Sequence, residues 1–179
     1  LHFYETFLES YDKVNKEKRG VYYTPLPVVR FIVRAVDDLL KTEFNLPHGL
    51  ADDTKVKYKR FVYVDTSNKR AKQPKEVWSE EEIYKVQILD PATGTGTFLA
   101  ETIRKIYEYF VNQKGIWSQY VDNALIPRLN GFEIMMTPYV MCHLKLDLLL
   151  QDTGYITTKQ TNRFNVYLTN ALEKDETTK

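Results

Sequence analysis

Apolar residues recur every three or four positions in several stretches of the chain, which is the spacing of one helix face. This pattern predicts helices over 2–14, from Pro27 to about Thr42, and over 97–113, 116–126 and 138–151. In the helix after Pro27, the buried side is expected to consist of Val28, Val29, Ile32, Val33, Val36, Leu39 and Leu40.

Three short apolar runs of strand length alternate with the later helices. They cover 86–89, 129–134 and 164–169. A β-α-β-α-β order is typical of a parallel sheet with right-handed crossovers, so we expect a doubly wound α/β fold.

The stretch from Lys55 to Glu82 is dense in charge and holds one strand-like piece at 61–64. It divides the chain into an N-terminal helical region (1–50), a charged insertion (51–85) and an α/β region (86–179). Because a charge run is usually solvated surface, we expect a hairpin inserted before the sheet. The alternative is a DNA-facing basic loop formed by Lys55, Lys57, Lys59, Arg60, Lys69, Arg70, Lys72 and Lys75.

Composition narrows the function classes only modestly. The 25 basic and 24 acidic residues nearly cancel, so the whole chain lacks a strong nucleic-acid footprint. The single cysteine, Cys142, rules out an internal disulfide and is expected to be buried, which fits a cytoplasmic location. No apolar run approaches about 18 residues, so no membrane span is expected. The three histidines lack metal-ligand spacing.

The clearest candidate site is the loop that follows the first run of the sheet, in the stretch Val86–Leu99. An acid, Asp90, ends the run, and Gly94 and Gly96 would let the backbone approach a ligand at the carboxyl edge of the sheet. A phosphate loop would need a Gly-Lys-Ser/Thr ending, which is lacking here. A dinucleotide loop would need a third glycine where Leu99 stands.

S-adenosylmethionine fits this stretch better, because it is cationic and has no phosphate. It needs carboxylates near the loop, and Asp90 and Glu133 supply them. Glu133 ends the next predicted strand, where an acid can accept hydrogen bonds from both ribose hydroxyls.

Four segments resemble motifs of the adenine-N6 DNA methyltransferases. Motif I of that family usually reads Asp-Pro-Ala-Cys-Gly-Thr-Gly-Thr-Phe-Leu, and residues 90–99 match it except for Thr93 in place of Cys. Residues 20–25 resemble motif X, residues 131–134 motif II and residues 166–172 motif III. The order X, I, II, III is that of the gamma class, and the chain is most similar to the methylase region of large single-chain restriction–modification enzymes.

The resemblance implies a Rossmann-like class I fold with N-terminal helices and a role for each matching residue. Glu133 would bind the ribose, Ile134 would pack on the cofactor's adenine, and Asn170 would read its exocyclic amine. Tyr23 and Thr24 would contact the methionine end from the opposite side. The methionine end itself would be lined by Asp90, Ala92, Gly94 and Gly96, with Thr97 and Phe98 closing the loop onto the helix.

The family's catalytic Asn/Asp-Pro-Pro-Tyr/Phe motif is lacking, since the sequence contains no Pro-Pro pair up to its last residue, Lys179. The resemblance therefore implies that the catalytic residues lie beyond Lys179. We expect the cofactor-binding half of a restriction–modification methyltransferase, inactive alone, that meets DNA through other parts of a longer protein. Two alternatives stay open at this point. One is an RNA or protein-glutamine methyltransferase fragment, and the other is a non-enzymatic module for assembly or DNA clamping.

Overall fold

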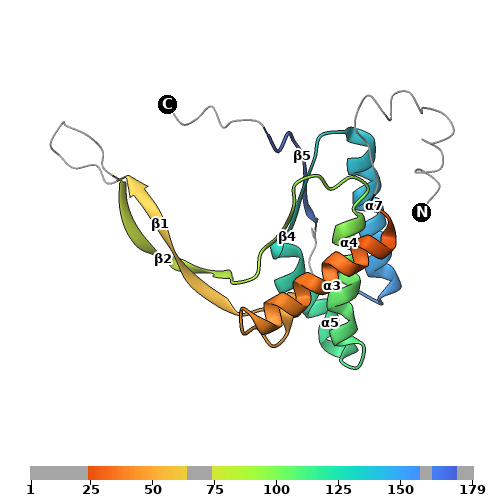
Figure 1. The fold of residues 1–179 in the computed structure, drawn as a ribbon, viewed down its shortest axis with the longest axis horizontal. Coiled ribbons are helices and arrows are strands. Elements are labelled where there is room, and N and C mark those ends of the chain that lie inside the picture. The colour runs from red at the N-terminus through yellow and green to blue at the C-terminus, as the bar shows by residue number, and fades with distance from the viewer. Residues whose placement is uncertain (1–23, 64–73, 158–162, 173–179) are drawn as a thin grey trace.

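A computed structural model describes residues 24–63, 74–157 and 163–172, and its body is a small α/β unit (Figure 1). Its sheet has three parallel strands in the order β3-β4-β5. Asp90 pairs with Gly131, and Glu133 pairs with Leu168. The strands are β3 (Ile88–Asp90), β4 (Leu129–Glu133) and β5 (Asn165–Leu168).

Three long helices lie on one side of this sheet in Figure 1. They are α3 (Leu26–Thr42), α4 (Thr97–Phe110) and α7 (Met136–Asp152), and α4 contacts both of the others. Right-handed crossovers between strands in consecutive order place both connecting helices on one face. The expected α/β class with a parallel sheet is confirmed, whereas the helix layer on the second face that a doubly wound sheet implies is not seen among the described residues.

Two helix predictions need correction. The helix expected over 97–113 ends at Phe110. The helix expected over 116–126 is broken by a π-helical turn, because its backbone bonds shift register before Pro127. The observed elements are α5 (Lys114–Tyr120), η2 (Val121–Leu125) and α6 (Ile126–Arg128). The helix expected over 2–14 lies outside the described residues.

The predicted buried face of α3 is only partly buried. Val29 and Val33 are buried and Leu40 is partly buried. Val28, Ile32, Val36 and Leu39 are between 39% and 52% exposed. The apolar stripe is wider than the contact with α4, so periodicity alone overstated the burial.

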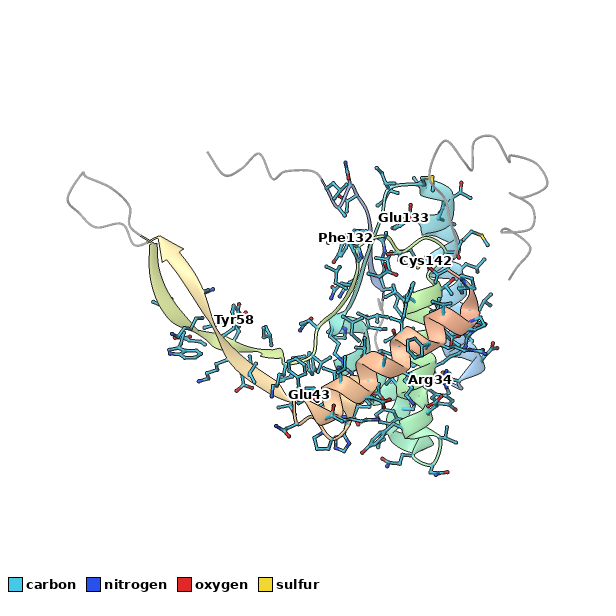
Figure 2. The ribbon with its side chains drawn as sticks, in the orientation of Figure 1. Arg34, Glu43, Tyr58, Phe132, Glu133 and Cys142 are labelled. Atoms are coloured by element: carbon cyan, nitrogen blue, oxygen red, sulfur yellow. The ribbon has the colours of Figure 1, made fainter. Side chains whose placement is uncertain are left out.

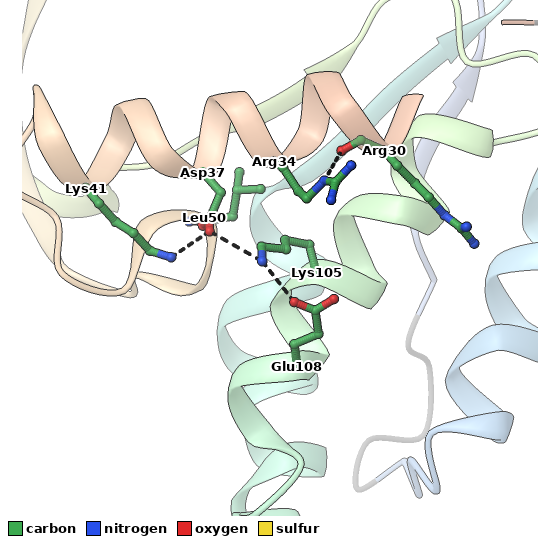
Figure 3. A network of polar contacts seen from close by, with 7 residues as sticks. All are labelled: Arg30, Arg34, Asp37, Lys41, Leu50, Lys105 and Glu108. Atoms are coloured by element: carbon green, nitrogen blue, oxygen red, sulfur yellow. Dashed lines mark hydrogen bonds and ion pairs between the residues drawn. The ribbon is translucent and has the colours of Figure 1, made fainter. Parts of the chain in front are cut away.

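The sequence reading missed the buried acid on α3, Asp37. Its carboxylate accepts hydrogen bonds from the Leu50 amide (2.9 Å) and from Lys41 Nζ (2.6 Å), and Lys105 Nζ of α4 lies 3.9 Å away (Figure 3). Leu50 belongs to the short turn η1 (Gly49–Ala51). Asp37 thereby joins α3, η1 and α4.

A buried arginine, Arg128, connects η1 to the core. Its guanidinium donates to the carbonyls of Leu50 (2.6 Å) and Asp52 (2.8 Å) and to the Tyr120 hydroxyl. The Tyr120 hydroxyl in turn donates to the Ala51 carbonyl (2.9 Å). Arg128 therefore fixes the chain where it leaves the body.

The charged segment leaves the body as a long antiparallel hairpin (Figure 1). Its strands are β1 (Lys55–Tyr63) and β2 (Pro74–Tyr84), with a bulge between Lys57 and Lys59. The two strands contact mainly each other. The strand-like piece expected at 61–64 overlaps only the outer end of β1.

Among the described residues, no helix is both long and apolar enough to cross a membrane.

Candidate functional site

The loop between β3 and α4 turns sharply at two glycines. Gly94 and Gly96 have φ values of 55° and 78°, a region in which a side chain is strained. The Gly96 amide bonds to the Thr93 carbonyl (2.8 Å), and the Gly96 carbonyl accepts the first helical bond of α4 from Ala100 (2.9 Å). The glycine turn therefore leads directly into the first turn of α4.

Gly96 is also required by packing inside the protein. A Cβ built on it would lie 2.6 Å from Cys142 Sγ of α7. Sequence reasoning assigned this glycine to close approach of a ligand. In the structure its lack of a side chain makes room for Cys142, which is fully buried as predicted.

Glu133, at the carboxyl end of β4, holds the loop against the sheet (Figure 2). Its Oε2 accepts the Gly94 amide and its Oε1 accepts the Met135 amide, both at 2.8 Å. Its side chain is buried. The two sequence-predicted acids, Asp90 and Glu133, thus lie at adjacent strand ends beside the same loop.

Thr93 also holds the loop against the sheet. Sequence reasoning treated it only as a small residue in place of the family's usual cysteine. Its hydroxyl lies 2.9 Å from the Phe132 carbonyl and 3.1 Å from the Asp90 carbonyl. A Cβ on Gly131 would lie 2.5 Å from Thr93 Oγ1. The glycine inside β4 was a usable signal, because such a glycine often marks close approach of another backbone.

Asp90 has one satisfied and one unsatisfied carboxylate oxygen. Oδ1 accepts the Ala92 amide at 3.1 Å, whereas Oδ2 is buried and has no hydrogen-bond partner. Burial raises the pKa of this carboxyl; the Ala92 bond opposes the rise and the negative charge of Glu133 adds to it. Buried polar atoms are nearly always bonded, so this oxygen marks a place for a donor.

A cation that sequence reasoning missed reaches the same loop from α7. Lys145 Nζ lies 3.1 Å from Thr97 Oγ1 and 3.4 Å from Thr95 Oγ1. It lies one helical turn after Cys142, so the contact of Cys142 with Gly96 could have suggested it.

The remaining predicted residues differ in their placement. Ile134 is 65% exposed just past β4, and Asn170 is exposed just past β5, where its Oδ1 accepts the Leu172 amide (3.0 Å). Thr24 is exposed before α3, and no described hydrogen bond joins it to the loop; Tyr23 lies outside the described residues. Ala92 is exposed, while Thr97 and Phe98 are half-buried.

The catalytic residues stay a prediction from the sequence. They are expected beyond Lys179, and Lys179 itself lies outside the described residues, the last of which is Leu172. The structure therefore places the loop, its two acids and the strand ends beside them, and it does not test where the catalytic motif lies.

A mostly apolar hollow of about 400 Å³ borders this loop. It lies between α3 and β3, with Asp90, Pro91 and Phe98 in its wall. No group of three or more potential metal ligands occurs in the part of the chain that the structure describes.

Comparisons with known proteins give a family match in the N-terminal region and similar solved structures over most of the chain. Residues 2–48 match the model of a family described as N-6 DNA Methylase. Over 95% of its length the chain is similar to DrdV, solved by cryo-EM as a complex with DNA, with 26% identity and a TM-score of 0.58. The resemblance to the N-6 DNA methylases is thereby confirmed.

A second solved structure shares the fold. It is a nuclease-deletion mutant of the Type ISP restriction–modification enzyme LlaGI with a DNA substrate mimic. The identity is 22% and the TM-score 0.55 over 93% of this chain. The chain spans only 12% of the DrdV chain and 11% of the LlaGI chain. No curated protein matches it.

Proposed function

We propose that this chain is the S-adenosylmethionine-binding part of an adenine-N6 DNA methyltransferase of a restriction–modification system. The observation that carries the proposal is Asp90 Oδ2, a buried acceptor without a donor at the carboxyl end of β3. Ligands of open α/β sheets bind at this edge. A methyl donor with an ammonium group would supply the missing hydrogen bond.

The neighbouring residues fit the rest of such a cofactor. Glu133 uses two acceptor positions on backbone amides, and a carboxylate has about four, so ribose hydroxyls could still bond to it. The exposed side chain of Ile134 would cover one face of the adenine ring. Asn170 would accept from the exocyclic amine with the second lone pair of its Oδ1. When bound, the cofactor supplies a methyl group activated by its sulfonium.

DNA adenine as the methyl acceptor is supported by the motif order and by the family match. Of the two similar structures, one was solved with DNA and the other with a DNA substrate mimic. These observations favour DNA over RNA or protein glutamine. The presence of Asp90 and Glu133 beside the loop also argues against the alternative of a non-enzymatic assembly module, which would not need these acids.

Calorimetric titration of the full-length protein with S-adenosylmethionine tests the cofactor. We expect Asp90→Asn and Glu133→Gln each to weaken binding at least tenfold. Glu108→Gln is the matched control, because Glu108 is exposed on α4 and pairs with Lys105. No binding by the wild-type protein, or equal affinity in all three variants, would overturn the proposed site.

A methyl-transfer assay with labelled cofactor tests the reaction. The full-length protein should label adenine in DNA. The 179-residue chain alone should show no turnover, because enzymes that act on a base must extrude and grip it and this chain lacks the Pro-Pro motif that does so in the family. Labelling of RNA or protein but not DNA would overturn the assignment of the substrate.

A further inference from the structure

The β1–β2 hairpin carries a net positive charge in a chain that is nearly neutral as a whole. The hairpin, residues 55–84, contains eight lysines and arginines and five acids, against 25 basic and 24 acidic residues in the whole sequence. The proposed methyl-transfer site uses none of them. The hairpin therefore needs an explanation of its own.

Three lysines of this segment lie on one face of β1. Lys55, Lys57 and Lys59 alternate along the strand and are all exposed, while Val56 and Tyr58 between them are half-buried. Alternate residues of a strand point to the same face at about 7 Å intervals. The lysines thus form a row roughly 13 Å long by the same spacing, which we call the lysine row.

The opposite strand adds aromatic rings to this face. Lys59 Nζ lies 5.2 Å from the centre of the Trp78 ring, and Lys55 Nζ lies 4.8 Å from that of Tyr84. Trp78 is 63% exposed. On β2, Glu82 pairs with Lys57, and Glu80 and Glu81 lie in the irregular stretch between Glu82 and Trp78. These cation–π contacts hold Lys55 and Lys59 in place on the face of the hairpin.

The base of the hairpin is fastened to the body. The Lys85 amide donates to the Thr54 carbonyl at 2.8 Å, closing the two strands together. The Tyr84 hydroxyl donates to the Asn123 carbonyl of η2. Beyond this base the hairpin extends away from the sheet (Figure 1), so the lysine row is presented at a fixed place outside the body.

We propose that the lysine row binds the phosphate backbone of the DNA duplex outside the catalytic region, as a clamp that does not read sequence. Duplex DNA carries one negative charge per about 1.7 Å of its axis, so a row roughly 13 Å long faces several phosphates. A two-stranded ribbon also has dimensions that a DNA groove admits. The choice of DNA as the partner rests on the proposed function.

The test measures DNA affinity of the full-length protein as a function of salt. Fluorescence anisotropy with a labelled duplex compares wild type with the triple variant Lys55→Gln, Lys57→Gln, Lys59→Gln. Each lost phosphate contact lowers the slope of log K against log salt by about 0.9, so the slope should fall by about 2 to 3. The loss should be equal for two duplexes of unrelated sequence.

Two controls separate charge from folding. The triple variant with arginine at the same positions keeps the charge and should keep the wild-type slope. Arg34→Gln removes an exposed charge on α3, away from the hairpin, and should leave the slope unchanged. Both triple variants should bind S-adenosylmethionine like the wild type, which shows that the body is folded.

Three results would overturn the clamp: a wild-type slope in the glutamine triple, a loss confined to one DNA sequence, or no DNA binding by the wild-type protein. Failure of the proposed function is distinguishable from these. If the proposed function is wrong, the wild-type protein will not bind S-adenosylmethionine. The slope of log K for DNA against log salt would still report on the lysine row.

Discussion

The loop between β3 and α4 and the β1–β2 hairpin are both rich in polar groups, yet they are stabilised in opposite ways. In the loop, Thr93 and Glu133 are buried and bond to backbone atoms of neighbouring elements. In the hairpin, Lys57 and Trp78 are exposed and the strands contact mainly each other. Substitutions in the loop should therefore change folding as well as cofactor binding, whereas those in the hairpin should change DNA binding alone.

The largest effect is expected where the chain leaves the body toward the hairpin, at Arg128. Arg128→Met removes the donor to the Leu50 and Asp52 carbonyls and to Tyr120. Unpaired buried groups cost about 1 to 3 kcal/mol each, so the free energy of unfolding should fall by about 3 kcal/mol after partial relaxation. Denaturant unfolding followed by circular dichroism measures it, with Arg34→Met as the exposed control.

If Arg128→Met and Arg34→Met lowered the free energy of unfolding equally, the base of the hairpin would not depend on the Arg128 guanidinium.

An effect of similar size is expected at Gly96. Gly96→Ala places a side chain at a φ of 78° and 2.6 Å from Cys142 Sγ. The left-handed backbone costs about 1 to 2 kcal/mol and overpacking a further 1 to 3 kcal/mol or so. Adding Cys142→Ala should recover the packing part only. A double-mutant cycle measures this coupling, and strict additivity would contradict it.

Sequence reasoning succeeded where one residue type suits one local task. Residues 90–97 were assigned to a strand end, a glycine turn and a helix start, and the structure has all three. Sequence reasoning failed where a residue is required by its contact with an element far away in the sequence. Gly96 faces Cys142 of another helix, Lys145 contacts Thr97 of α4, and Asp37 bonds to Leu50 of η1.

The apolar face of α3 shows that a sequence pattern can also predict more burial than the structure has. The period of its apolar residues was right, but the period does not say how wide the packed contact is. Phe31 is 66% exposed and Val36 42% exposed on a helix whose inner residues Val29 and Val33 are buried. Burial depends on what packs against a helix, which its own sequence does not encode.

A smaller effect, of opposite sign, is expected at Asp90. Asp90→Asn should raise the free energy of unfolding of the cofactor-free protein at pH 7, because it replaces a carboxylate whose charge is disfavoured by burial and by Glu133 with a neutral amide. The raised pKa of Asp90 sets the pH dependence. Its contribution to stability is fully present below the unfolded value of 3.8 and is lost as pH rises through the folded pKa.

The advantage of Asp90→Asn should therefore grow as the pH rises above the unfolded value of 3.8, in unfolding experiments at several pH values. The same variant should lose cofactor affinity. A variant that is both less stable and fully able to bind would show that Oδ2 serves the fold alone.

The smallest effect on folding is expected at the tryptophan of the hairpin, and the chain supplies its own control. Trp78 is 63% exposed, whereas Trp117 is 1% exposed and donates its indole N–H to Thr153 (2.9 Å). Trp78→Ser should change the free energy of unfolding by less than about 0.5 kcal/mol, as is usual for surface substitutions. Trp117→Ser should cost about 3 kcal/mol or more through the cavity it leaves. Equal losses, measured by denaturant unfolding, would mean that the hairpin packs against the body in solution, and the lysine row could not then stand clear of it to meet DNA.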